Sequence, residues 1–254
     1  MINPGKKTYD LAQPYFPGMP HFPNHPPFVR GLTKLHGEVM LPDGGSSTME
    51  VITMSGHTGT HVDALNHFSC NGRFFDGQDV VPVQSYSGGV EHLSVDTIEP
   101  MVRRAVVFDI AALMKVDAVE ADFVVTPEHL QACKVEIRPG DVVMIRTGWA
   151  KHFRNPGKYL SNLKSPGIEI DAARWLSERK PFAIGADTAA LERLPSPKFA
   201  VHVHLLVETG IHIIENLDLE EVGRDQVREM LFVGAPLKIE AGTGAPIRPL
   251  GFVD

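Results

Sequence analysis

Residues 55–68 read SGHTGTHVDALNHF, and this stretch decides how the fold and chemistry are interpreted. His57, His61, Asp63 and His67 fall within eleven residues of one another. Imidazole nitrogens and carboxylate oxygens are the usual protein ligands of Zn²⁺, and they also suit Mn²⁺. A single histidine in a loop is most often a surface residue. Four such groups flanked by small residues instead predict a metal site.

The backbone around the first two histidines is expected to be a strand that enters a loop. Residues 58–60, Thr-Gly-Thr, are poor helix-forming sequence, and Gly59 allows the chain to fold tightly. The helical zinc-protease motif H-E-x-x-H is excluded, because Thr58 stands where its glutamate would be. The serine-hydrolase motif G-x-S-x-G is absent from the sequence.

The acidic residue and the last histidine of the stretch suggest two further roles. Asp63 could bind the same ion as His61, or it could bridge to a second ion. His67 can lie nearby without being a ligand. A free imidazole beside a metal ion is a ready general acid or base, because its pKa is near neutral.

The whole chain of 254 residues has ordinary globular composition, with 43% hydrophobic and 22% charged residues. The net charge of −7 argues against nucleic-acid binding, which usually needs a basic face. No apolar run approaches the 18 residues of a membrane-spanning helix, and no signal-peptide core is visible near residue 1. Two cysteines make no disulfide framework. We therefore expect a cytoplasmic protein with no membrane or nucleic-acid partner.

Strand-like segments mixed with short helices predict one α/β domain over residues 1–254, richer in strands than a doubly wound fold. Its proline-rich N-terminal arm, residues 1–30, is expected to be extended, irregular and packed over the core. The expected strands are 33–41, 47–54, 104–110, 142–148, 182–187 and 211–214, with a closing hairpin at 235–241 and 246–253. The expected helices begin at the Thr126-Pro127 cap, run from Asp171 to about Lys180, and cover 202–209.

The 55–68 stretch resembles the signature H-x-G-T-H-x-D-x-P-x-H of the metal-dependent cyclase family, which includes bacterial kynurenine formamidase and isatin hydrolase. The matching residues are His57, Gly59, Thr60, His61, Asp63 and His67, and Leu65 stands in place of the proline. The resemblance extends over nearly the whole chain, through residues 17–28, 142–149, 201–217 and 235–248. It implies the family's swivelling β/β/α fold with a central mixed, barrel-like sheet. It also implies a homodimer or homotetramer.

The resemblance also implies a ligand set. Residues 201–217 resemble the segment that supplies a histidine and a glutamate to a second metal in formamidase relatives. Glu215 matches the glutamate, and His202 is preferred to His204 for the histidine. Isatin hydrolases lack this pair and hold one manganese, so its presence favours two ions. The expected metal ligands, for one or two Zn²⁺ or Mn²⁺ ions per chain, are His57, His61, Asp63, His202 and Glu215.

The implied function is hydrolysis of a small amide by metal-activated water, with an aryl formamide as the leading substrate. His67 is the expected catalytic acid or base, and Phe22 and His25 are candidate substrate contacts. Core packing is the alternative for Phe22. The alternative reaction is ring opening of a cyclic amide or lactone, and the family's name also covers ring closure. A catalytically silent metal-binding scaffold is the competing class, but such a scaffold has no use for a free His67.

Three other polar residues have weaker interpretations. Asp187 resembles a family landmark near the site, and a helix cap is an equal alternative. Glu192 is interpreted as a solvated charge. Arg146 is interpreted as part of a structural salt bridge at a strand end rather than as a ligand for a substrate carboxylate.

Overall fold

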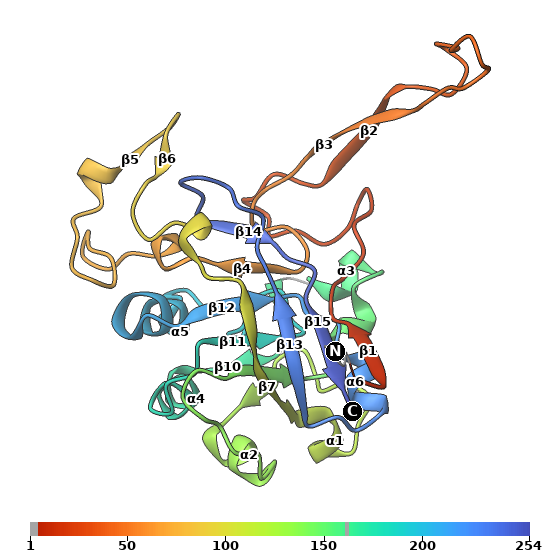
Figure 1. Ribbon diagram of the computed structural model, residues 1–254. Helices are drawn as coiled ribbons and strands as arrows, with labels where there is room; N and C mark the ends of the chain where they lie inside the picture. Colours follow the sequence, from red (N-terminus) through yellow and green to blue (C-terminus); the bar gives the residue numbers. More distant parts are fainter. Residues whose placement is uncertain (1–4, 161–162) are drawn as a thin grey trace.

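The computed structural model describes residues 5–160 and 163–254 (Figure 1). Its centre is a curled, mixed sheet of nine strands in the order β1-β15-β13-β7-β9-β11-β12-β4-β14. The four strands β7, β9, β11 and β12 are parallel, and the flanking strands pair antiparallel. The nine strands are β1 (Lys7–Asp10), β15 (Leu250–Val253), β13 (Glu229–Gly234), β7 (Met101–Asp109), β9 (Val142–Arg146), β11 (Ala183–Ala186), β12 (His212–Glu215), β4 (His61–Asp63) and β14 (Gly244–Pro246). The predicted mixed α/β class is confirmed.

The central strands are apolar at almost every position because both faces of the sheet are covered. In β7, Val106 and Phe108 belong to one buried cluster, whereas Ala105 and Val107 belong to the other. Strand β9 alternates in the same way. Successive side chains of a strand point to opposite faces, so a continuous apolar run supplies two cores at once.

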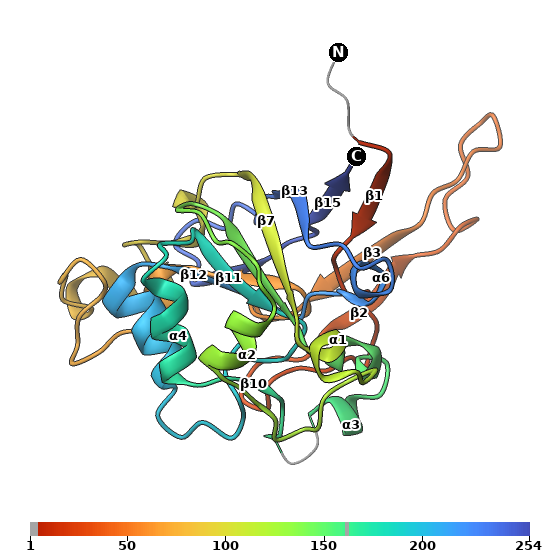
Figure 2. The ribbon, with the colours of Figure 1, turned by 90° about the horizontal axis from the view of Figure 1, so that it is seen from below.

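Helices cover one of these faces, and Figure 2 shows α2 and α4 on the same side of the central strands. The helices are α1 (Ile110–Met114), α2 (Pro127–Ala132), α3 (Pro156–Tyr159), α4 (Ile170–Ser177), α5 (Ala200–His202) and α6 (Glu220–Arg224). Helix α5 continues as a wider π-helical turn over Val203–Thr209. Tight 3₁₀ turns cover Leu65–His67, Val81–Val83, Val95–Thr97 and Trp149–His152. None of the helices among the described residues is long and apolar enough to span a membrane.

Three small sheets complete the fold. They pair β2 (Val29–Lys34) with β3 (Met49–Thr53), β5 (Gln84–Ser85) with β6 (Gly89–Val90), and β8 (Val124–Val125) with β10 (Gly167–Ile168). The β2–β3 hairpin stands away from the rest of the molecule in both views (Figures 1 and 2).

Most element predictions are confirmed. Thr126 caps α2 and Pro127 is its first residue, and the helix before Gly210 covers 200–209. The expected strand 47–54 is present in shorter form as β3, whereas the expected strand 33–41 is misplaced: β2 covers Val29–Lys34, so the two share only residues 33 and 34. Residues 35–41 are exposed, and the hairpin that carries them projects away from the body of the molecule.

Three local predictions are wrong. Residues 7–10 of the N-terminal arm form edge strand β1 rather than irregular chain, because they pair with β15; residues 1–4 of the arm lie outside the described part. Helix α4 is preceded by Glu169 at its N-cap, and Asp171 lies in its first turn. The closing hairpin predicted for 235–241 and 246–253 does not form. Strand β15 pairs with β13 and β14 pairs with β4, and residues 235–241 are not a strand.

Candidate metal centre

Strand pairing builds the centre of the site. Strand β4 runs antiparallel to β12, and this register sets His61 directly opposite Glu215. Asp63 is two residues beyond His61 and therefore lies on the same face, while Val62 between them is fully buried in the opposite core. Nε2 of His61 lies 3.4 Å from Oδ1 of Asp63 and 3.4 Å from Oε2 of Glu215.

The loop before β4 brings His57 to the same carboxylate. Gly59 has a φ of +62°, and the ring of Tyr15 packs where its Cβ would be, so the expected tight fold needs glycine. Nδ1 of His57 lies 2.7 Å from Oδ1 of Asp63, and its Nε2 lies 3.0 Å from Oγ1 of Thr243. Residue 243 immediately precedes β14, the neighbour of β4.

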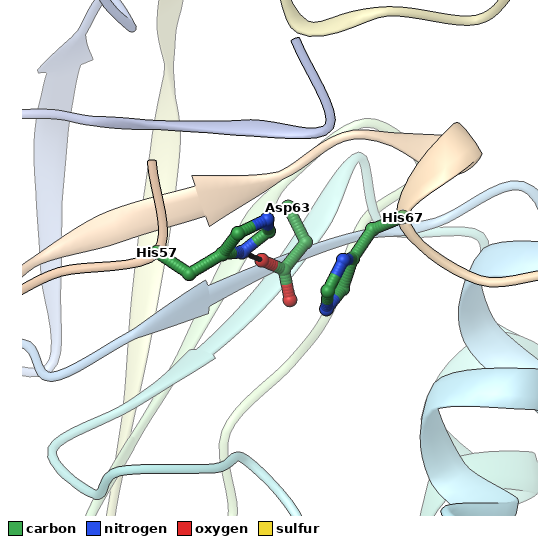
Figure 3. A group of neighbouring side chains, drawn as sticks. All are labelled: His57, Asp63 and His67. Atoms are coloured by element: carbon green, nitrogen blue, oxygen red, sulfur yellow. Dashed lines mark hydrogen bonds and ion pairs between the residues drawn. The ribbon is translucent and has the colours of Figure 1, made fainter. Parts of the chain in front are cut away.

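His67 ends the 3₁₀ turn that follows β4. Its ring stacks on the ring of His57 with centroids 4.0 Å apart. Figure 3 shows the carboxylate of Asp63 beside these two stacked imidazoles. One ring nitrogen of each histidine and one Asp63 oxygen fall within 4.8 Å of one another. Asp63 thus lies next to both imidazoles of this stacked pair.

Helix α5 supplies the remaining histidine. Nε2 of His202 lies 3.3 Å from Oε1 of Glu215 and 3.9 Å from Oδ2 of Asp63. His204 instead contacts Ser177 at 2.9 Å and Glu208 at 2.7 Å, both outside the cluster. Of the two candidate histidines, the structure therefore brings His202, and not His204, to Asp63 and Glu215.

The charges of the cluster explain its pKa values. Burial lowers the pKa of His61, but the hydrogen bond and charge of Asp63 and the charge of Glu215 outweigh burial and raise it to about 9. Burial likewise opposes protonation of His202, yet its bonds to Glu192 and Glu215 raise its pKa to about 10. Carboxylates buried this deeply favour a nearby positive charge.

His67 behaves differently from its neighbours. Burial and the nearby histidines lower its pKa to about 3, against the weaker opposing effect of Asp63. These surroundings favour the neutral form of the imidazole. A neutral imidazole offers a lone pair, so the resting side chain can accept a proton or bind a cation.

The arrangement fits a divalent cation. Oδ2 of Asp63 is buried and accepts no hydrogen bond in the described part of the chain, although a buried carboxylate oxygen normally finds a donor. Asp63 belongs to two groups of possible ligands, one with His57 and His67 and one with His61 and Glu215. In addition, Nδ1 of His61 donates to the carbonyl oxygen of Gly59 at 2.8 Å, which directs Nε2 toward the carboxylates.

The histidines of the cluster and Glu215 line a cleft of about 150 Å³. Phe22 and His25 line it together with His57, His61, His67, Phe68, Phe199, His202 and Glu215. The ring centroids of Phe22 and Phe199 are 6.2 Å apart, and those of His25 and His57 are 5.6 Å apart. Both candidate substrate contacts therefore reach the cleft. Sequence reasoning missed Phe68, Phe199 and Thr243, of which only Phe68, beside His67, had a signal in the motif.

Comparison with known proteins agrees with this geometry. Residues 9–193 match the Cyclase family, described as “Putative cyclase”. The chain belongs to this cyclase family. The family match ends before His202, but relatives align over most of the chain. Kynurenine formamidase of Bacillus thuringiensis subsp. konkukian is 26% identical over 239 residues, which is 94% of each chain.

Two further similarities support the same family. Isatin hydrolase of Roseibium aggregatum is 29% identical over 226 residues, which are 83% of this chain and 77% of that protein. The crystal structure of a novel cyclase superposes with a TM-score of 0.88 at 26% identity, covering 96% of this chain and 86% of that one. The cyclase-family fold expected from the sequence is confirmed.

Glu192 of this cyclase-family chain is not the solvated charge that the sequence suggested. It is 2% exposed, and its carboxylate lies 2.5 Å from Nδ1 of His202. It also accepts hydrogen bonds from Oγ of Ser196 and from the backbone N–H of Val201. The charge is buried because it holds the imidazole whose other nitrogen faces Glu215, an arrangement that orients metal-binding histidines.

We expect Glu192→Gln to weaken metal binding by about 10- to 100-fold, because the amide is a poorer acceptor and leaves His202 less firmly oriented. Titration calorimetry with Zn²⁺ or Mn²⁺ measures the change. The matched control is Glu208→Gln, which alters the similar carboxylate pair with His204 outside the cluster. Equal affinity for both variants and the parent chain would refute the orienting role.

The contacts of Asp187 and Arg146 in this cyclase-family chain are structural. The Asp187 carboxylate accepts from the backbone N–H and hydroxyl of Thr147 and from the backbone N–H of Gly148, at 2.6–2.9 Å. Burial raises its pKa, against the effect of those hydrogen bonds. Arg146 pairs with Asp109 at 2.9 Å, in agreement with the predicted salt bridge.

We expect Asp187→Ala to lower the free energy of unfolding by about 3 kcal/mol, because two buried backbone N–H groups lose their acceptor. Urea denaturation measures this loss. The control Asp171→Ala removes an exposed carboxylate and should change stability by less than about 1 kcal/mol. Similar midpoints for both variants would contradict the structural role of Asp187.

Proposed function

We propose that this chain is a metal-dependent hydrolase of small, non-peptide amide C–N bonds, with an aryl formamide as its preferred substrate. One observation carries the proposal: the Asp63 carboxylate is shared by two imidazole-containing groups, whose histidines line a cleft with aromatic walls. The relatives named kynurenine formamidase and isatin hydrolase support the same reaction class.

His57, His61 and Asp63 would hold one cation, and His202 and Glu215 would complete a second position through the shared Asp63. Zinc and manganese both suit this mixture of nitrogen and oxygen donors. When bound, the cation polarises a carbonyl group and lowers the pKa of water at the site.

The chain's own residues perform the proton transfers. His67 lines the cleft, so its ring nitrogen can accept a proton from the attacking water. The same nitrogen then returns that proton to the leaving amine as the C–N bond breaks. The products are formate and the free aryl amine, with one water consumed. This use of His67 argues against the silent scaffold.

The cleft walls favour a flat aromatic substrate. Phe22, Phe68 and Phe199 present rings to the cleft, and offset or edge contacts between rings add to the apolar area that a bound aryl group buries. A small acyl group such as formyl leaves room for water beside Asp63 and His67 in a cleft of about 150 Å³.

The test compares N-formylkynurenine with isatin after loading the protein with Zn²⁺ or Mn²⁺. We expect kcat/KM for the formamide to exceed that for isatin by at least about tenfold, a difference of about 1.4 kcal/mol in the barrier. A preference for isatin would establish the ring-opening alternative. No turnover of either compound by metal-loaded protein would reject the hydrolase proposal.

A further inference from the structure

Asn216 follows Glu215 directly at the end of β12, and each of its polar groups has a partner in another segment. The residue is buried, with 7% of its surface exposed. Its backbone N–H donates to the carbonyl oxygen of Thr188 at 2.9 Å, and its carbonyl oxygen accepts from the hydroxyl of Thr60 at 2.6 Å. The backbone beside the candidate ligand Glu215 is therefore tied both to the segment after β11 and to the loop before β4.

The side-chain amide of Asn216 forms a bridge between two further segments. Its Nδ2 donates to the carbonyl oxygen of Gly59 at 3.0 Å, and its Oδ1 accepts from the hydroxyl of Tyr159 at 2.9 Å. A carbonyl oxygen can only accept hydrogen bonds, so the nitrogen of the amide must face Gly59. The buried hydroxyl of Tyr159 also lies 3.2 Å from the carbonyl oxygen of Asp187. The amide thus uses a donor and an acceptor at once, which neither an ionised carboxylate nor an alkyl side chain can do.

The carbonyl group of Gly59 is shared with a candidate metal ligand. It also accepts from Nδ1 of His61 at 2.8 Å, so two N–H donors hold one oxygen atom. Glycine is the residue type with the greatest conformational freedom, and the φ of Gly59, +62°, lies in the left-handed region. Without the bond from Asn216, the Gly59 peptide is free to rotate, and the imidazole bonded to it changes direction as well. The amide of Asn216 therefore acts on His61 through one intervening carbonyl group.

The backbone conformation at Asn216 accounts for the residue type. Its φ of +56° lies in the left-handed region, where asparagine is several times more frequent than most residues with a side chain. Glycine also adopts this conformation but has no amide. Alanine adopts it at an energetic cost and cannot make the bridge. Asparagine thus satisfies both requirements of the position: a turn in the chain directly after Glu215, and a bond to Gly59.

We propose that Asn216 is a positioning residue of the metal centre, whose amide holds His61 opposite Glu215 through the carbonyl group of Gly59. The inference rests on the metal-dependent function proposed above, and it adds a residue that acts on the ligands rather than on the cation. Nε2 of His61 lies 3.4 Å from Oε2 of Glu215 and 3.4 Å from Oδ1 of Asp63. Ligand atoms that are held in place before the cation arrives lose less freedom when it binds, so binding is tighter.

The test is cation affinity in the variant Asn216→Gly. Glycine accepts the left-handed conformation and keeps both backbone hydrogen bonds, so the change removes the amide alone. Titration calorimetry with Zn²⁺ or Mn²⁺ should show a dissociation constant about 10- to 100-fold higher than that of the native chain, the usual effect of losing a group that orients a ligand. The visible absorption spectrum of the Co²⁺-loaded protein, which depends on ligand geometry, should also change.

Two further variants separate the amide from general effects. Asn216→Ala also lacks the amide but strains the backbone, so it should be less stable to urea than Asn216→Gly and lose the same amount of cation affinity. Asp141→Ala acts at the opposite end of the parallel strands from Glu215. It removes a buried carboxylate that accepts from the backbone N–H of Arg138 and from Arg104, both at 2.7 Å. It should lower the urea midpoint and leave the dissociation constant and the Co²⁺ spectrum as in the native chain.

Equal dissociation constants and equal Co²⁺ spectra for the native chain and Asn216→Gly would overturn this inference alone. Weaker binding by Asn216→Ala but not by Asn216→Gly would also overturn it, because the effect would then come from backbone strain. The same holds if Asp141→Ala loses as much affinity as Asn216→Gly, because a general loss of stability would then be enough. A native chain that binds no cation would reject the proposed function first, and this inference with it.

Discussion

Replacing Asp63 with asparagine is expected to remove bound metal and to lower kcat/KM for the formamide by about 10⁴-fold or more. The amide has nearly the same shape but no charge, so it can neither neutralise a cation nor bridge two ions. A loss of several kcal/mol of electrostatic stabilisation corresponds to this factor. The shared position of Asp63, between imidazoles from two groups, makes this the most damaging single substitution at the site.

Elemental analysis after purification without chelator measures the metal content per chain, and initial rates measure kcat/KM. The exposed Asp171→Asn serves as the control for loss of one carboxylate. If Asp63→Asn retained the full metal content of the parent chain, the cation would have to bind elsewhere, and the assignment of this centre would fail.

The second large effect concerns His67. We expect His67→Ala to keep the metal and to lose about 10²- to 10⁴-fold in kcat, the usual contribution of a general acid or base. Added imidazole should restore part of the rate, because it can occupy the space that the ring leaves and transfer the same proton. The readouts are kcat with and without imidazole, and metal per chain.

His204→Ala is the matched control for this variant. It removes a nearby histidine whose contacts are Ser177 and Glu208, so metal content and kcat should both stay close to those of the parent. One ring nitrogen of His67 lies within 4.8 Å of a His57 nitrogen and an Asp63 oxygen, close enough for the three to bind one cation. Loss of metal from His67→Ala would therefore show that His67 is a ligand and would overturn its assignment as the proton carrier.

The local part of the metal centre could be predicted from the sequence because its side chains lie close together in the chain. The spacing of His57, His61, Asp63 and His67 pointed to one cluster, and the structure brings all four together. The contribution of Glu215 came only from the family resemblance. Its position opposite His61 depends on which strands pair, and the two residues are 154 positions apart in the chain.

The failures of prediction have the same physical origin. Glu192 carries no local sign of burial, because its partner His202 is brought to it by the packing of α5. The expected hairpin at 235–253 failed because β13 and β4, rather than each other, are the partners of the last two strands. Local propensity describes a segment, whereas burial and pairing depend on the whole sheet.

The side chains of β4 alternate between the metal centre and the core, and this alternation limits which mutations the site can tolerate. Val62 is held in the core between two site residues, so a shift of one position would bury His61 and Asp63 among apolar side chains and expose the valine. The aromatic walls, by contrast, include Phe22 on a segment without regular structure and Phe199 at a helix start. Substitutions in the aromatic walls can therefore change which substrates the cleft admits while the residues of the metal centre stay in place. This makes the fold a favourable starting point for engineering specificity for other amides.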